Sequence, residues 1–133
     1  MQQSHTCHNS TQTMPHDADT ARLDRLRDLV RQFVDERDWA QFHTPKNLAM
    51  AMSIEAAEVM EHFQWLPTGR ELADDKRTAV GHELADVLVY LVRLADVLDI
   101  DLPAAVAEKM QLNREKYPAD RVRGDARKYD EYE

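Results

Sequence analysis

Apolar residues recur every three or four positions through most of this chain, and that spacing predicts amphipathic helices. A first helix is expected to begin after Asp19 or Thr20, either of which is a good N-cap, and to end near Asp38. Its apolar side is formed by Leu23, Leu26, Val30, Phe33 and Val34. Residues 1–19, which precede it, have almost no apolar content and cannot offset the entropy of ordering, so we expect a disordered tail there.

Three further helices are expected, over about 46–65, over about 73–98 (or from 70) and over about 103–116. Thr44-Pro45 caps the first of these with proline at the first helical position, and Asp101-Leu-Pro103 plays the same part for the last. The helix over 46–65 has apolar residues on more than one face, which predicts that it is buried nearly all round. The helix over 73–98 has one continuous apolar stripe, formed by Leu84, Val87, Leu88, Leu91, Leu94 and Leu98.

These elements predict an all-α protein with a single folded domain, residues 20–133. The chain has only 3 glycines in 133 residues, and good helix formers dominate its middle. Four helices with short connections indicate a four-helix bundle. The apolar surface of the second helix exceeds what one small bundle covers, so we expect helices of another subunit to complete the bundle.

Charge and cysteine content narrow the function classes. With 17 basic and 25 acidic residues the formal net charge is -8, which argues against a duplex nucleic acid as partner but not against a nucleotide. The single cysteine, Cys7, cannot form an internal disulfide, which favours a reducing compartment. No stretch is apolar enough to span a membrane, and no hydrophobic signal core begins the chain. We therefore expect a cytoplasmic protein without membrane contact.

Two acidic pairs share one helical spacing, Glu55 with Glu58 and Glu83 with Asp86. Residues three apart lie on the same side of a helix, so each pair points its carboxylates in one direction. Neither 49–60 nor 78–92 contains a lysine or arginine, although cations usually interleave a solvated acidic stripe. Four carboxylates in one small volume are costly unless a hard divalent cation binds them. The pattern predicts a Mg²⁺ site, and therefore an active site.

Two alternatives bear on this site. A redox di-iron centre in a helical bundle uses Glu-x-x-His pairs, and neither His62 nor His82 falls three residues after an acid. An all-oxygen site instead favours Mg²⁺ or Mn²⁺, together with hydrolysis at phosphorus. Glu61 extends the first pair by one turn, and the sequence leaves open whether it is a fifth ligand, a general base or an exposed helix residue.

Other residues carry weaker signals. Aromatic residues flank the second helix, namely Trp39, Phe42, His43 and Trp65, and Tyr90 lies one turn after Asp86. These rings would enclose a flat base, or they would pack in the core or anchor helix ends. Lys109 and Asn113 are four residues apart on the last helix. They would meet phosphate oxygens, or belong to a solvated helix face.

The acidic pairs and several other segments of the sequence resemble a known family. Glu55-x-x-Glu58, a gap of 24 residues and Glu83-x-x-Asp86 are similar to the metal signature of the MazG-like all-α nucleoside triphosphate pyrophosphohydrolases. Several segments resemble the dCTP pyrophosphatase branch of that family, namely 36–43 (ERDWAQFH), 45–48 (PKNL), 63–65 (FQW), 86–90 (DVLVY), 101–103 (DLP), 113–118 (NREKYP) and 127–129 (RKY). The resemblance covers about residues 22–130.

The resemblance implies a MazG fold and assigns roles to residues. It implies that Glu55, Glu58, Glu83 and Asp86 hold Mg²⁺. It implies a base and sugar pocket lined by Trp39, Ala40, Gln41, Phe42, His43, Trp65 and Tyr90, with Lys109 and Asn113 approaching the triphosphate. It also implies a homotetramer, a dimer of dimers, with pockets between subunits. One departure is Val30, which stands where vertebrate relatives carry a histidine, so a base contact from this position is not expected.

The leading hypothesis is Mg²⁺-dependent hydrolysis of a (deoxy)nucleoside triphosphate to the monophosphate and pyrophosphate. The first substrates to consider are dCTP and modified dCTP, in a role of cleansing the nucleotide pool. A water whose pKa is lowered by the metal would attack the α-phosphorus, with Glu58 or Glu61 accepting its proton. The alternative is a metal-stabilised helical oligomer that binds a nucleotide or a protein partner without hydrolysing it.

Overall fold

The computed structural model describes residues 15–128 and residue 131. Within them lie the helices α1 (Pro15–Asp35), α2 (Pro45–Glu61), α3 (Asp74–Val97), α4 (Leu102–Lys116) and α5 (Ala119–Val122), with the short 3-10 helix η1 (Ala40–Phe42) before α2. No strand occurs in the described part of the chain, so the predicted all-α class is confirmed. No helix among the described residues is long and apolar enough to cross a membrane.

The observed helix ends differ from the predicted ones at both ends of α1, at the end of α2 and at the start of α3, and α5 was not predicted. Helix α1 ends at Asp35 rather than near Asp38. Helix α1 begins at Pro15, inside the predicted tail, because proline at a first helical position is pre-organised for a helix. Residues 1–14, with Cys7, lie outside the described residues. Helix α2 ends at Glu61 rather than near Trp65, since the amides of His62 and Phe63 bond three residues back and tighten the chain into turns. Helix α3 begins only at Asp74, after an extended Ala73.

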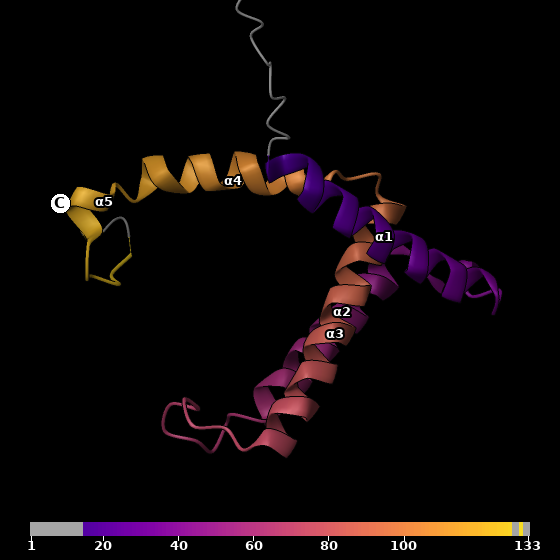
Figure 1. Cartoon of the computed structure of the whole chain (residues 1–133), viewed down its shortest axis with the longest axis horizontal. Coiled ribbons are helices and arrows are strands. Elements are labelled where there is room, and N and C mark those ends of the chain that lie inside the picture. Colours follow the sequence, from indigo (N-terminus) through magenta and orange to yellow (C-terminus); the bar gives the residue numbers. More distant parts are fainter. Residues whose placement is uncertain (1–14, 129–130, 132–133) are drawn as a thin grey trace, which may run out of the picture.

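The helices α2 and α3 form an antiparallel hairpin joined by residues 62–73, and they make the most extensive contact between elements (Figure 1). Helix α1 crosses the end of this hairpin that lies away from the 62–73 loop and packs on α3. Helix α4 touches α1 and then runs outward, leaving the hairpin behind (Figure 1). One chain therefore does not close into a bundle, and completion of the bundle by further subunits stays a prediction.

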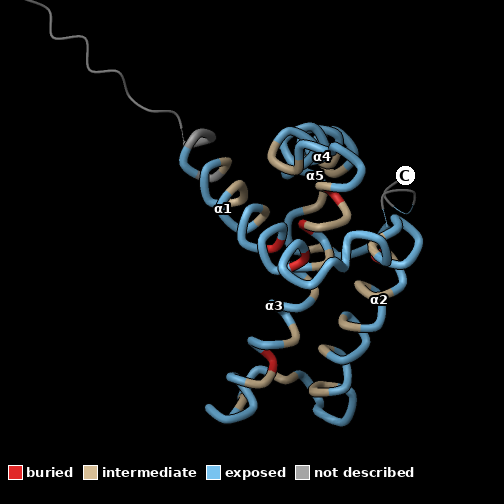
Figure 2. Tube along the Cα trace, turned by 90° about the vertical axis from the view of Figure 1, so that its right-hand side faces the viewer, coloured by how far each residue is buried: buried red, intermediate tan, exposed pale blue. Residues whose placement is uncertain are grey.

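The core is small and lies mainly where α1 crosses α3 (Figure 2). Its buried apolar side chains are Val30, Val34, Leu48, Val80, Val92 and Ala95. Val30 belongs to this core, so its side chain is not available to a base. In α2 only Leu48 is buried, whereas Met50, Ile54 and Met60 are 56%, 58% and 64% exposed. The predicted burial of α2 on all sides is not reached within one chain, because α3 covers a single face of it.

Candidate active site

The positions of the acidic residues depend on where α2 and α3 begin, and local sequence signals set the start of each helix. The Thr44 hydroxyl accepts a hydrogen bond from the Asn47 amide at 3.2 Å, and Pro45 occupies the first turn. The side-chain amide of Asn47 also donates to the Phe42 carbonyl at 3.0 Å, which ties η1 to the start of α2. Helix α3 opens with Asp74 and Asp75, whose charges complement the positive end of the helix dipole.

Three of the four predicted metal ligands converge between the two helices. Glu55 and Glu58 of α2 and Glu83 of α3 each offer a carboxylate oxygen, and these oxygens all lie within 4.8 Å of one another. Desolvation by burial raises the pKa of Glu55, and so do the charges of Glu58, Asp86 and Glu83 together with a hydrogen bond to Glu58. Asp86 is thus near enough to act on Glu55, although it lies outside the tight cluster.

The residues of this cluster fit a hard divalent cation. Each contributes carboxylate oxygens, the preferred ligands of Mg²⁺ and Mn²⁺, and their mutual repulsion is what a bound cation would relieve. The imidazole of His62 lies beside the cluster. Its Nε2 is 3.8 Å from Oε1 of Glu83, and the ring is charged only when it is protonated. The raised pKa of Glu55 indicates that the charged form of this one carboxyl is disfavoured, first by desolvation and then by the neighbouring acids.

A pocket of about 710 Å³ lies beside the cluster, at the end of the hairpin where α2 and α3 are joined. Glu58 and Glu83 form part of its wall, and so do Glu61 and Trp65. Glu61 is exposed on this wall and is not one of the three clustered carboxylates. The ring of Trp65 is 87% exposed and forms an apolar surface next to the acids. Lys76, from the first turns of α3, also lines the pocket, and the sequence analysis did not single it out.

The predicted base-binding segment 39–43 lies at the other end of the hairpin. It comprises Trp39, the three residues of η1 (Ala40, Gln41 and Phe42) and His43. The Trp39 ring packs edge-on against Phe33 at 5.8 Å between centroids, and Gln41 donates to the Asp38 carbonyl and carboxylate. Glu55 comes ten residues after Pro45, about 15 Å further along α2. Within one chain, segment 39–43 is therefore separated from the acids, and half-buried Tyr90 lies between the two along α3.

Lys109 and Asn113 lie on α4, which leads away from the hairpin (Figure 1). Lys109 is exposed and Asn113 half-buried. One chain does not bring either side chain to the acidic cluster, so their contact with a phosphate stays a prediction that requires a second copy of the chain.

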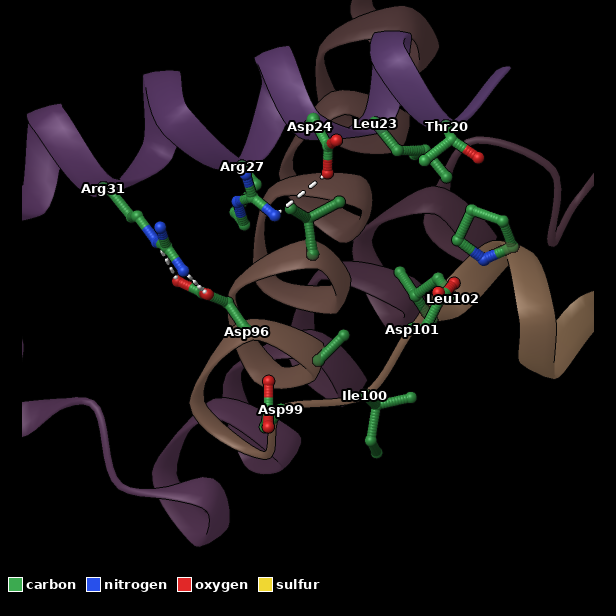
Figure 3. Close-up of a pocket in the computed structure, with 13 residues that line it drawn as sticks. Thr20, Leu23, Asp24, Arg27, Arg31, Asp96, Asp99, Ile100, Asp101 and Leu102 are labelled. Atoms are coloured by element: carbon green, nitrogen blue, oxygen red, sulfur yellow. Dashed lines mark hydrogen bonds and ion pairs between the residues drawn. The ribbon is translucent and has the colours of Figure 1, made fainter. Parts of the chain in front are cut away.

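One group of charged residues was not anticipated. The Asp96 carboxylate of α3 accepts two hydrogen bonds from Arg31 of α1, seen as dashed lines in Figure 3, and one from Arg93. Arg93 in turn donates to His43. The spacing of Arg93 and Asp96 is a recognisable helical pair, but no local signal in the sequence joins them to Arg31 or His43. Arg31 and Asp96 also line a second pocket, of about 290 Å³, between α1, the end of α3 and the start of α4. Figure 3 shows both side chains at this pocket.

Comparison with known proteins places this geometry in a family. A model of the MazG-like family matches residues 50–132, which include the whole acidic cluster. The chain belongs to the MazG-like family. The resemblance inferred from its motifs is therefore confirmed.

This MazG-like chain is similar to mammalian proteins. It is 45% identical over 113 residues to dCTP pyrophosphatase 1 of Homo sapiens, in an alignment that covers 82% of this chain and 66% of the human protein. It is 44% identical over 111 residues to dCTP pyrophosphatase 1 of Bos taurus, covering 80% and 66%. The matched part is thus slightly less than two thirds of the length of these relatives.

A solved structure supports the fold independently. The crystal structure of a pyrophosphatase from Archaeoglobus fulgidus matches with a TM-score of 0.61 and 37% identity, covering 88% of this chain and 99% of the archaeal one. The helical fold of this chain is thus shared with a solved pyrophosphatase over most of the chain's length.

Proposed function

We propose that this chain hydrolyses a (deoxy)nucleoside triphosphate to the monophosphate and pyrophosphate in a Mg²⁺-dependent reaction. The observation that carries the proposal is the convergence of Glu55, Glu58 and Glu83 beside an open pocket, in a chain that belongs to the MazG-like family. The names of the relatives make dCTP the first substrate to test, followed by modified dCTP. We further propose a cytoplasmic role in cleansing the nucleotide pool.

The proposed chemistry divides roles among this chain's own residues. A divalent cation, when bound, supplies positive charge to the phosphate oxygens and acidifies a water molecule. Glu55, Glu58, Glu83 and Asp86 would hold it. Glu61 lines the same pocket outside the tight cluster, so its carboxylate is the better placed to accept a proton from water, with Glu58 as the second candidate. The water oxygen bonds to the α-phosphorus while the bond from that phosphorus to the bridging oxygen breaks, and pyrophosphate leaves.

Substrate binding is proposed to require more than one copy of the chain. The apolar side chains of α2 are more than half exposed at three positions, and α4 has exposed Val106, Met110 and Leu112. Burying these surfaces against a second hairpin would place an α4 near an acidic cluster, where Lys109 and Asn113 would meet the triphosphate. The same assembly would bring segment 39–43, Trp65 and Tyr90 around the base. We propose the homotetramer, a dimer of dimers, as that assembly.

The proposal is tested by incubating the full chain with a panel of nucleoside triphosphates and Mg²⁺ and measuring both products. We expect equal amounts of monophosphate and pyrophosphate, with the highest turnover on dCTP or a modified dCTP. Glu58→Gln and Asp86→Asn are each expected to lower turnover at least a hundredfold while the oligomer persists in size-exclusion chromatography. Glu108→Gln, an exposed acid of α4, is the matched control and is expected to retain wild-type turnover.

Two results would refute parts of this proposal. Tight nucleotide binding by the wild-type chain without products would favour the alternative, a metal-stabilised oligomer that binds without hydrolysis. Wild-type pyrophosphate release by both Glu58→Gln and Asp86→Asn would remove the acidic cluster from the reaction.

A further inference from the structure

The Asp96 network links three elements at the end of the hairpin where α1 crosses α3. Asp96 accepts a hydrogen bond from Nε of Arg31 at 2.8 Å, a second from the other arm of that guanidinium, and a third from Nη1 of Arg93 at 2.9 Å. The side chains of Asp96 and Arg93 are only 7% and 12% exposed. A carboxylate so enclosed holds the Arg93 guanidinium in a fixed orientation, because their bond joins two charges that water scarcely reaches, whereas the Arg31 side chain is 48% exposed.

The fixed orientation of Arg93 determines which nitrogen of His43 carries the proton. While its Nη1 bonds Asp96, its Nε donates to Nδ1 of His43 at 3.3 Å. A neutral imidazole whose Nδ1 accepts a hydrogen bond carries its proton on Nε2, which is then a donor. His43 comes directly after η1, in the segment proposed to line the base and sugar pocket.

Burial and the charge of Arg93 also keep His43 neutral. Desolvation lowers the pKa of His43 below the ordinary histidine value, and the charge of Arg93 lowers it further. Within its own segment, the Asp38 carboxylate accepts a hydrogen bond from Gln41, and Lys46 is exposed. Arg93, from the packed helix α3, is the charged group that acts on His43. Both effects favour the form of the ring that has one donor and one acceptor.

We propose that Asp96 and Arg93 are positioning residues that present the Nε2–H of His43 as a hydrogen-bond donor to an acceptor oxygen of the nucleoside. The proposal rests on the proposed function and adds one specific contact to it. A carbonyl of the base or a sugar oxygen would accept from Nε2, whereas an amino group would meet a second donor and be disfavoured.

The first experiment observes His43 in the full chain without substrate. Long-range ¹⁵N–¹H NMR spectra distinguish the two imidazole nitrogens, and a His43→Gln variant identifies the His43 signals among the six histidines. We expect a protonated Nε2, an unprotonated Nδ1 that accepts from Arg93, and a titration midpoint below that of an ordinary histidine. Arg93→Met should raise the midpoint and mix the tautomers, while Asp96 keeps Arg31 as a partner. Arg27→Met is the matched control, since Arg27 pairs with Asp24 and Asp28 of α1.

The second experiment measures kinetics with the best triphosphate of the panel. A mixture of tautomers leaves only about half of His43 as the Nε2–H donor, so Arg93→Met is expected to raise KM about twofold with kcat nearly unchanged, and Asp96→Asn to raise it less. Arg27→Met should leave both constants unchanged. Circular dichroism verifies that each variant retains its helices.

Each outcome decides between the alternatives. A wild-type His43 protonated on Nδ1, or a midpoint and tautomer unaffected by Arg93→Met, would overturn the positioning role. An unchanged KM in Arg93→Met would overturn the nucleoside contact. Absence of pyrophosphate release by the wild-type chain with every triphosphate would refute the proposed function and the nucleoside contact together, and the NMR result would still separate that failure from a failure of the network.

Discussion

Replacing Glu55 by glutamine should make the metal-free chain more stable than the wild type. When Mg²⁺ is added, the same variant should become the less stable of the two. Desolvation raises the pKa of Glu55, and the charges of Glu58, Asp86 and Glu83 raise it further. Glutamine keeps the size of the side chain and removes one of the mutually repelling charges, and its amide can donate to the neighbouring Glu58 carboxylate. The metal-free variant should therefore be more stable than the wild-type chain, although it has lost a proposed ligand.

The geometry sets the magnitude. Carboxylate oxygens of Glu55, Glu58 and Glu83 lie within 4.8 Å of one another. Two unit charges at about that separation repel by roughly 0.9 kcal/mol in water, and salt near 0.1 M removes about a third of this. With two such neighbours, Glu55→Gln should raise the free energy of unfolding by about 1 kcal/mol, which is a few degrees in Tm for a chain of this size. Against this, Mg²⁺ at ten times its Kd should stabilise the wild-type chain by about 1.4 kcal/mol.

The assay is thermal unfolding at one protein concentration, once with a chelator and once over a series of Mg²⁺ concentrations. We expect Glu55→Gln to unfold a few degrees above the wild type in chelator and to show little Mg²⁺ response, so that the two curves of Tm against Mg²⁺ cross. Glu108→Gln is the matched control, because it neutralises an exposed acid on α4, away from the cluster. Its Tm should follow that of the wild type at every concentration.

Curves of Tm against Mg²⁺ concentration that do not cross would refute either the repulsion among the acids or the proposed cation site. A metal-free Glu55→Gln chain no more stable than Glu108→Gln would mean that the acids do not repel one another in solution. An undiminished Mg²⁺ response in Glu55→Gln would mean that the cation binds elsewhere.

Two further predictions concern pH and backbone conformation. Because the pKa of Glu55 is raised, the metal-free folded chain binds more protons than the unfolded chain between the ordinary carboxyl value of 4.5 and the raised value, so its stability should fall as pH rises through that window. Chemical denaturation across the window should show a shallower fall for Glu55→Gln, and an identical slope would contradict the assignment. Gly69 has a φ of +70°, and a Cβ there would lie 2.6 Å from Cδ1 of Phe63, so Gly69→Ala should lower the free energy of unfolding by at least about 1 kcal/mol. Gly81, with no atom within 4 Å of its Cβ position, provides the control: Gly81→Ala should be neutral or raise stability by up to about 1 kcal/mol, and an equal loss in both variants would exclude strain at Gly69.

Features determined by neighbouring residues could be predicted from the sequence. Thr44 caps α2, and the Asp101 carboxylate accepts from the Ala104 amide at 3.0 Å at the start of α4, both as expected from capping patterns. The spacing of three residues likewise placed the members of each acidic pair on one side of a helix. Convergence of the two pairs needed one further assumption, that successive helices with a short connection pack antiparallel.

Features that depend on distant residues could not be predicted. Arg31 and Asp96 are 65 positions apart and have neither a period nor a motif in common. Arg93 and His43 are 50 positions apart, and a histidine beside an arginine is not a pairing that charge patterns suggest. The end of α2 was misplaced for a different reason, because residues 62–65 contain no proline or glycine that would stop a helix, while the amides of His62 and Phe63 bond three residues back and form turns. Periodicity records which residues favour burial, but not where the backbone stops repeating.

Some residues of the proposed site lie together within one chain and others do not, and this difference determines which ligand needs the oligomer. The acids come from two adjacent helices of one chain, so a cation site can form as soon as the hairpin does. The phosphate and base contacts come from α4 and from segment 39–43, which one chain keeps apart from the acids. Ile54 is 58% exposed one residue before Glu55, so the apolar surface that would bind a second copy adjoins the metal ligands. We therefore expect Mg²⁺ affinity to change little when the chain is diluted, whereas nucleotide binding should weaken as the oligomer dissociates.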